Sequence, residues 1–181
     1  MIQIEARIEL LEQILAPWQS RIGADFEGYK NHCYRMLHFC FALAPQLVED
    51  DRTKMIVAAA HHDIGLWSAG TVDYLPPSIV EAKKYCENHQ LVQWEEEISL
   101  LISEHHKLKP YTGAYSQTVE VFRKADLVDF SLGTIRQGVS KETVKQVQQA
   151  FPNSGFHKFL LKGAWAWFRE HPVSMPPFMK W

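Results

Sequence analysis

The sequence predicts an all-α fold in a single domain. Most segments repeat apolar residues every three or four positions, as on one face of a helix. No strict apolar–polar alternation is long enough to indicate a strand, and no repeat or low-complexity linker divides the 181 residues. A chain of this length can bury a substantial core as one unit. We therefore expect a helical bundle spanning residues 1–181.

The first three helices are expected in the N-terminal third of the chain. Residues 2–15 place isoleucines and leucines on one stripe and glutamates opposite, and Pro17 ends this helix. A second helix is expected over about 26–43, after Asp25, which is a favourable N-cap residue. A third is expected to begin in the charged stretch EDDRTK and to end at Gly65.

The remaining helices are separated by glycine and proline. Residues 66–77 contain both residue types without any period, so we expect a loop there. Ser78 is expected to cap a short helix that ends near His89. Further helices are expected over residues 91–106, 116–131, 141–151 and 156–170. Aromatic residues of the last helix are expected to pack in the core; they are Phe156, Phe159, Trp165, Trp167 and Phe168.

Composition argues against several classes of protein. The formal net charge is −2, so neither a nucleic-acid polymer nor a membrane surface is indicated as a partner. The longest apolar stretch, around MLHFCFALA, is too short to cross a bilayer. Acidic residues near the N-terminus argue against a signal or transit peptide. The cysteines form no CxxC pair and are expected to be buried free thiols. We therefore expect a cytoplasmic protein.

Several polar residues interrupt otherwise apolar helices. His32 lies in the middle of one expected helix, and Asp126 lies within another. His62 and Asp63 follow a run of small apolar residues. Taken singly, each could be a packed, surface or salt-bridged residue, because a buried aspartate is costly unless it is paired or metal-bound. Together, imidazole and carboxylate groups suit a first-row divalent ion, and the helices of a bundle could bring them together.

These residues lie in motifs that resemble a known family. The segments NHCYR, AAAHHDIG and RKADLVD are similar, over roughly residues 26–130, to the H…HD…D signature of the HD superfamily of metal-dependent phosphohydrolases. The resemblance implies an HD-type helical domain, with C-terminal helices at about 141–171 outside the motif-bearing core. It implies a divalent ion (Mn, Ni, Co, Fe, Zn or Mg) with the ligands His32, His62, Asp63 and Asp126. His61 falls where family members usually have an apolar residue, so it is not expected to be a ligand.

The mechanism implied by the resemblance is hydrolysis of a phosphoester by a metal-activated water. Asp63 or Asp126 could accept the proton of that water. The expected catalytic residues are Asp63 and the pair His105–His106, which closes another helix. Candidates for binding the substrate phosphate are Lys107, Lys109 and Lys124, although each taken alone is more typical of a solvated surface lysine.

The substrate is expected to be a small phosphorylated metabolite or a nucleotide, and no motif identifies it. One metal ion is favoured, because His89 lies at a polar helix end and is a poor candidate for a second site. Two alternatives stay open: an HD-type di-iron oxygenase and a non-catalytic regulatory module. Trp67 and Tyr74 could line a substrate pocket or simply hold their loop in place. The proline-rich tail 171–181 could pack on the body or contact a second subunit of a homodimer.

Overall fold

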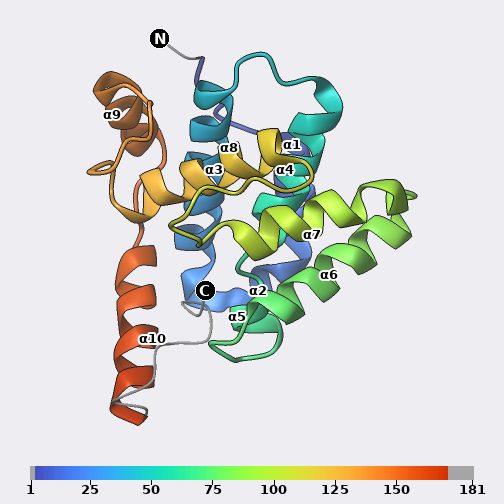
Figure 1. The fold of residues 1–181 in the computed structure, drawn as a ribbon. Helices are drawn as coiled ribbons and strands as arrows, with labels where there is room; N and C mark the ends of the chain where they lie inside the picture. Colours follow the sequence, from blue (N-terminus) through green and yellow to red (C-terminus); the bar gives the residue numbers. More distant parts are fainter. Residues whose placement is uncertain (1–2, 171–181) are drawn as a thin grey trace.

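The computed structural model describes residues 3–170, and every regular element in that range is helical (Figure 1). The all-α prediction is therefore confirmed. The helices are α1 (Glu9–Leu15), α2 (Gln19–Ile22), α3 (Phe26–Leu43), α4 (Glu49–His61), α5 (Gly65–Ser68), α6 (Leu75–Asn88), α7 (Glu95–Glu104), α8 (Ser116–Phe130), α9 (Lys141–Ala150) and α10 (Phe156–Glu170). Short 3₁₀ turns lie at Ala16–Trp18, Gly23–Asp25 and Val92–Trp94. Within the described range, no helix is both long and apolar enough to cross a membrane.

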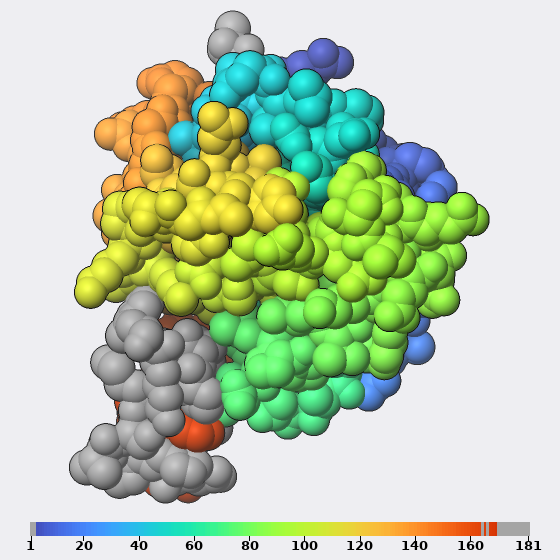
Figure 2. Space-filling model, turned by 45° about the vertical axis from the view of Figure 1, so that its right-hand side comes forward, coloured from blue at the N-terminus to red at the C-terminus, as the bar shows by residue number. Residues whose placement is uncertain are grey.

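The core surrounds α3, which packs against α4 and α8. α7 packs on both α4 and α8, and α6 lies beside α7, so that these two helices form one continuous face (Figures 1 and 2). Leu37, Met55 and Phe122 are among the side chains fully removed from solvent at the helix contacts. The three cysteines are buried free thiols, as the sequence predicts. Each of the helices α3, α4 and α8 therefore has one side facing the centre of the bundle.

α10 is different, because most of it extends away from this core (Figure 1). Its first residue, Phe156, is only 3% exposed, whereas Leu161 and Trp165 are 71% and 69% exposed. The prediction of core packing is therefore correct for Phe156 but wrong for Trp165 and for Phe168, which is also exposed. The outer half of α10 has too few neighbours among the described residues to cover its apolar side chains. The tail 171–181 lies outside the described residues.

The first helix begins at Glu9 rather than at residue 2. Two backbone groups upstream are engaged by side chains of α3: Glu5 N–H donates to His38 Nε2 at 3.0 Å, and Ile8 N–H donates to the Tyr34 hydroxyl at 3.1 Å. Both donors are thereby satisfied without a helical turn. The apolar spacing predicts a longer helix because a local sequence pattern contains no information about such long-range partners.

Gly65 does not end α4, which stops at His61, but begins the short helix α5. A Cβ atom on Gly65 would lie 2.1 Å from the carbonyl oxygen of Tyr74, so this close approach requires glycine. The Ser78 hydroxyl accepts a hydrogen bond from Gly65 N–H at 2.9 Å instead of capping α6, which begins earlier, at Leu75. The expected loop is therefore partly helical, and its contact with Gly65 holds Tyr74 beside the turn that contains Asp63.

Candidate metal centre

Three helices bring the predicted ligands to one buried point. His32 comes from the middle of α3, His62 and Asp63 from the turn after α4, and Asp126 from α8. His32 Nε2 lies 2.9 Å from His62 Nε2 and 3.7 Å from Asp126 Oδ1. Asp63 Oδ2 lies 3.3 Å from His62 Nε2 and 4.0 Å from His32 Nε2. The structure thus places His32, His62, Asp63 and Asp126 together.

The turn after α7 adds two histidines to this cluster. His105 Nε2 lies 3.6 Å from Asp63 Oδ1, and His106 Nδ1 lies 3.8 Å from Asp126 Oδ2. Three overlapping triads have ligand atoms within 4.8 Å of one another: His32–His62–Asp126, His62–Asp63–His105 and His105–His106–Asp126. His105 is therefore as close to the centre as the predicted ligands, although the sequence predicts a catalytic role for it and not that of a ligand.

Hydrogen bonds fix the orientation of three imidazoles. His32 Nδ1–H donates to Asp129 Oδ2 at 2.7 Å, His62 Nδ1–H donates to a backbone carbonyl at 2.8 Å, and His105 Nδ1–H donates to another at 2.6 Å. Each ring therefore presents the lone pair of Nε2 to the centre. Burial lowers the pKa of His32 to about 4, although Asp129 opposes this, so the ring is neutral at pH 7. A neutral imidazole in this orientation can bind a metal ion through Nε2.

The centre contains polar atoms that a bound cation would satisfy. The Nε2 lone pairs of His32 and His62 face each other at 2.9 Å, where neither can donate a hydrogen bond. Asp63 Oδ1 and His105 Nε2 are buried and have no hydrogen-bond partner among the described residues. Such unsatisfied groups are rare in a folded interior. A divalent ion accepts electron pairs from nitrogen and oxygen together, so the residues present fit a metal.

The two aspartates of the centre differ in charge state. Burial raises the pKa of Asp126 to about 7; nearby Asp63 and Asp129 add to this increase, whereas His105 opposes it. Burial also acts to raise the pKa of Asp63, but His62 and His105 outweigh it and hold that pKa well below its usual value. At neutral pH, Asp63 is therefore a carboxylate, whereas Asp126 is near its titration point and can exchange a proton.

A buried ion pair supports His32 from behind. Asp129, on the same face of α8 as Asp126, accepts hydrogen bonds from Arg35 Nε at 2.6 Å and Nη2 at 2.8 Å as well as from His32. Burial opposes ionisation of Asp129, but these bonds hold its pKa below the usual range. The guanidinium also donates to the carbonyls of Phe151 and Pro152, at 3.1 Å each. Sequence reasoning assigned no role to Arg35 or Asp129; their spacing of three residues from His32 and Asp126 was the available signal.

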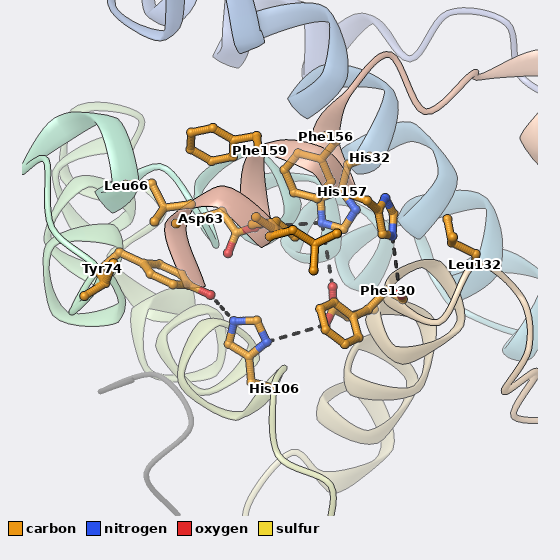
Figure 3. Close-up of a pocket in the computed structure, with 15 residues that line it drawn as sticks. His32, Asp63, Leu66, Tyr74, His106, Phe130, Leu132, Phe156, His157 and Phe159 are labelled. Atoms are coloured by element: carbon orange, nitrogen blue, oxygen red, sulfur yellow. Dashed lines mark hydrogen bonds and ion pairs between the residues drawn. The ribbon is translucent and has the colours of Figure 1, made fainter. Parts of the chain in front are cut away.

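A cavity of about 360 Å³ opens beside the cluster (Figure 3). Its floor includes His32, Asp63, His106 and Asp126. Tyr74 also lines it and forms a hydrogen bond between its hydroxyl and His106 Nε2. The volume is typical of a pocket that binds a small molecule. Unlike Tyr74, Trp67 is not among the lining residues described; it stacks on Phe159 of α10, with ring centroids 5.2 Å apart.

Comparison with known families agrees with this geometry. A family model of the HD domain matches residues 29–131, which is more than half of the chain. The chain belongs to the HD domain family. HD domains typically bind divalent metals, and the clusters described above could hold such an ion. No curated protein and no solved structure gives a significant match.

Three lysines that were candidates for phosphate binding lie away from the cavity of this HD domain. The described lining residues of the cavity do not include Lys107, Lys109 or Lys124. Lys107 Nζ pairs with Glu104 at 2.9 Å, and Lys124 Nζ lies 4.0 Å from Glu120. Each of these two ammonium groups lies beside a carboxylate one helical turn away. Although both lysines are close to the motif in sequence, they do not line the described cavity.

Two other histidines of the HD domain also lie apart from the centre. His61 is buried but donates through Nδ1 to the Val57 carbonyl at 2.8 Å and packs against Tyr85. His89 is exposed, bonds the Tyr85 carbonyl and stacks on the same ring. Neither belongs to the three triads found among the described residues. Of adjacent His61 and His62, only the second therefore faces the centre.

Proposed function

We propose that this HD domain is a metal-dependent phosphohydrolase that cleaves a phosphoester of a small phosphorylated molecule. The observation that carries the proposal is the convergence of His32, His62 and Asp63 on one buried point beneath an open cavity, where Asp63 Oδ1 and His105 Nε2 have no hydrogen-bond partner among the described residues. A structural cluster would satisfy these atoms internally, whereas a hydrolytic metal site keeps them for an ion. Membership of the HD family supports hydrolysis as the type of reaction.

Each residue has a role in this proposal. His32, His62, Asp63 and Asp126 would hold a divalent ion, which when bound lowers the pKa of a water and offsets charge on phosphoryl oxygens. A carboxylate oxygen of Asp63 or Asp126 that does not bind the ion would accept the proton of the attacking water. His106 is neutral, since burial lowers its pKa well below the usual value, and it lines the cavity where it can donate to a phosphate oxygen.

One alternative has a specific observation in its favour. The triads that contain His105 would provide ligands for a second ion, as an HD-type di-iron oxygenase requires. One ion remains our proposal, because beyond the four proposed ligands the triads add only His105 and His106, so that a second ion would have just two ligands of its own among the described residues. A purely regulatory module is disfavoured by the cavity and by the unsatisfied atoms beside it.

The test is phosphate release from a panel of phosphate monoesters and nucleotides, with Mn, Ni, Co, Fe, Zn or Mg supplied in turn. We expect metal-dependent release that Asp63→Ala abolishes while circular dichroism shows the helices intact. Lys109→Ala, an exposed residue near the site in sequence, is the matched control and should retain activity. Full activity of Asp63→Ala would contradict the proposal. So would a reaction that consumes oxygen and releases no phosphate.

A further inference from the structure

The walls of the cavity are chemically unlike its floor. Above the His and Asp side chains, the lining is formed by aliphatic and aromatic groups from three regions of the chain (Figure 3). Leu66 and Val72 come from the segment after Asp63, Phe130 from the end of α8, and Phe156 and Leu161 from α10. Phe156 stacks on the His32 ring with centroids 4.3 Å apart, so the apolar wall begins directly at the metal centre.

Polar groups on the upper walls are already engaged. His157 lines the cavity, but its Nε2 is bonded to the backbone carbonyls of Asp129 and Phe130, at 3.1 and 3.2 Å. The Tyr74 hydroxyl is bonded to His106. A substrate group that rises from the floor therefore meets carbon surface rather than hydrogen-bonding partners among the described residues. Water is displaced from such surface favourably only by an apolar group.

The charge of the site disfavours a second phosphoryl group. Among the described lining residues there is neither lysine nor arginine. A divalent ion would balance the two carboxylates of Asp63 and Asp126, and the described lining residues provide no further cation beyond the ion that would bind the first phosphoryl group. A second phosphate would lie against carbon atoms without a counter-charge, which is unfavourable in a partly buried cavity.

We infer that the substrate is a phosphate monoester whose organic group is an alkyl or aryl residue without a second phosphate. The inference rests on the proposed phosphohydrolase function. In the reaction, the water oxygen bonds to phosphorus, the ester P–O bond breaks, and the leaving oxygen gains a proton, which gives an apolar alcohol or phenol and inorganic phosphate. Nucleoside di- and triphosphates are poor substrates, because their additional charges would face the apolar wall.

A homologous series measures this preference without requiring turnover. The non-hydrolysable ligands are the alkylphosphonates from ethyl- to hexylphosphonate, titrated into the Mn-loaded full chain by calorimetry. Affinity should rise about fourfold for each added methylene, which corresponds to roughly 0.8 kcal/mol. 3-Phosphonopropionate, which carries a carboxylate where butylphosphonate ends in carbon, should bind at least tenfold more weakly than butylphosphonate.

A pair of exposed leucines provides the matched variants. Leu161 lines the cavity and is 71% exposed, whereas Leu108 is 64% exposed and is not among the lining residues. Leu161→Lys should reduce the preference for butylphosphonate over 3-phosphonopropionate at least threefold. Leu108→Lys, with the same change in charge, should leave this preference unchanged. Both substitutions are at exposed positions, so folding should be retained.

The outcomes separate this inference from the proposed function. Flat affinity along the series, no binding, or tighter binding of 3-phosphonopropionate would overturn the inference even if the protein hydrolyses other phosphoesters. If affinity rises along the series but no phosphate is released from hexyl phosphate, the proposed hydrolase function is contradicted, whereas the inferred selectivity of the site for apolar groups is supported. A rising affinity together with faster hydrolysis of hexyl phosphate than of glycerol 3-phosphate or a nucleoside triphosphate supports both.

Discussion

Arg35→Met tests the buried ion pair that supports the metal centre. Methionine keeps much of the length and apolar packing of arginine but removes the guanidinium. Asp129 would lose the donors at 2.6 and 2.8 Å and keep only the bond from His32. The carbonyls of Phe151 and Pro152 would lose their shared donor as well.

The expected loss of stability is large, because both partners are nearly inaccessible to solvent. Side-chain exposure is 2% for Arg35 and 0% for Asp129, so no water can replace the lost hydrogen bonds. Breaking a buried ion pair by removing one partner costs about 3–5 kcal/mol. In a chain of this size, each kcal/mol lowers Tm by about 2–4 °C, so the variant should melt roughly 6–20 °C lower.

The sign of the pH dependence follows from Asp129. The wild-type protein holds the pKa of Asp129 below its usual range, so the pair stabilises the fold above about pH 4, where the unfolded aspartate is also ionised. This contribution is lost as the pH falls further. In Arg35→Met the pKa of Asp129 rises, and protonation relieves the unpaired charge. The difference in stability between the two proteins should therefore be largest at pH 7 and shrink towards pH 4.

The assay is urea unfolding followed by circular dichroism at pH 7 and pH 4, with Arg7→Met as the matched control. Arg7 also pairs with a carboxylate, Glu9, at 2.7 Å, but that pair is exposed, with side-chain exposures of 64% and 61%. Arg7→Met should cause no measurable change. If Arg35→Met loses no more stability than Arg7→Met at pH 7, the reasoning about the buried pair is wrong.

Three further predictions concern the centre itself. Asp129→Asn should lower metal affinity about 10–100-fold in calorimetry, because it weakens the acceptor that orients His32, and unchanged affinity would contradict this role. His106→Ala should lower kcat more than it lowers metal content, since His106 faces the cavity; loss of a second bound ion would instead favour the two-metal alternative. Metal affinity measured by equilibrium dialysis should fall about tenfold from pH 8 to pH 6. The reason is that Asp126, whose pKa is about 7, must lose its proton to act as a ligand. Equal metal affinity at both pH values would refute this role of Asp126.

Local patterns predicted the helices that carry the site. The range 26–43 matches α3, and polar residues interrupting apolar helices identified His32, the His62–Asp63 pair and Asp126. These signals are local: the apolar period defines a face, and a polar residue on that face requires a partner. The structure supplies the partner by packing the three faces together.

Features that depend on distant contacts could not be predicted in the same way. Arg35 and Asp129 pair across 94 positions; their spacing of three residues from His32 and Asp126 places each on the same helix face as a ligand but does not indicate that the two residues pair. Phe156 reaches the His32 ring from a helix outside the matched HD region. Closeness in sequence is also a weak guide to position: Lys107 is near the motif but is directed towards Glu104 on the preceding turn and does not line the described cavity.

Anomalous diffraction from crystals of the Mn- or Zn-loaded protein tests the central claim most directly. We predict one strong peak within about 2.0–2.3 Å of His32 Nε2, His62 Nε2 and carboxylate oxygens of Asp63 and Asp126. A peak bound by His105 and His106 without His32 and His62, or stoichiometric metal bound elsewhere on the chain, would contradict the account.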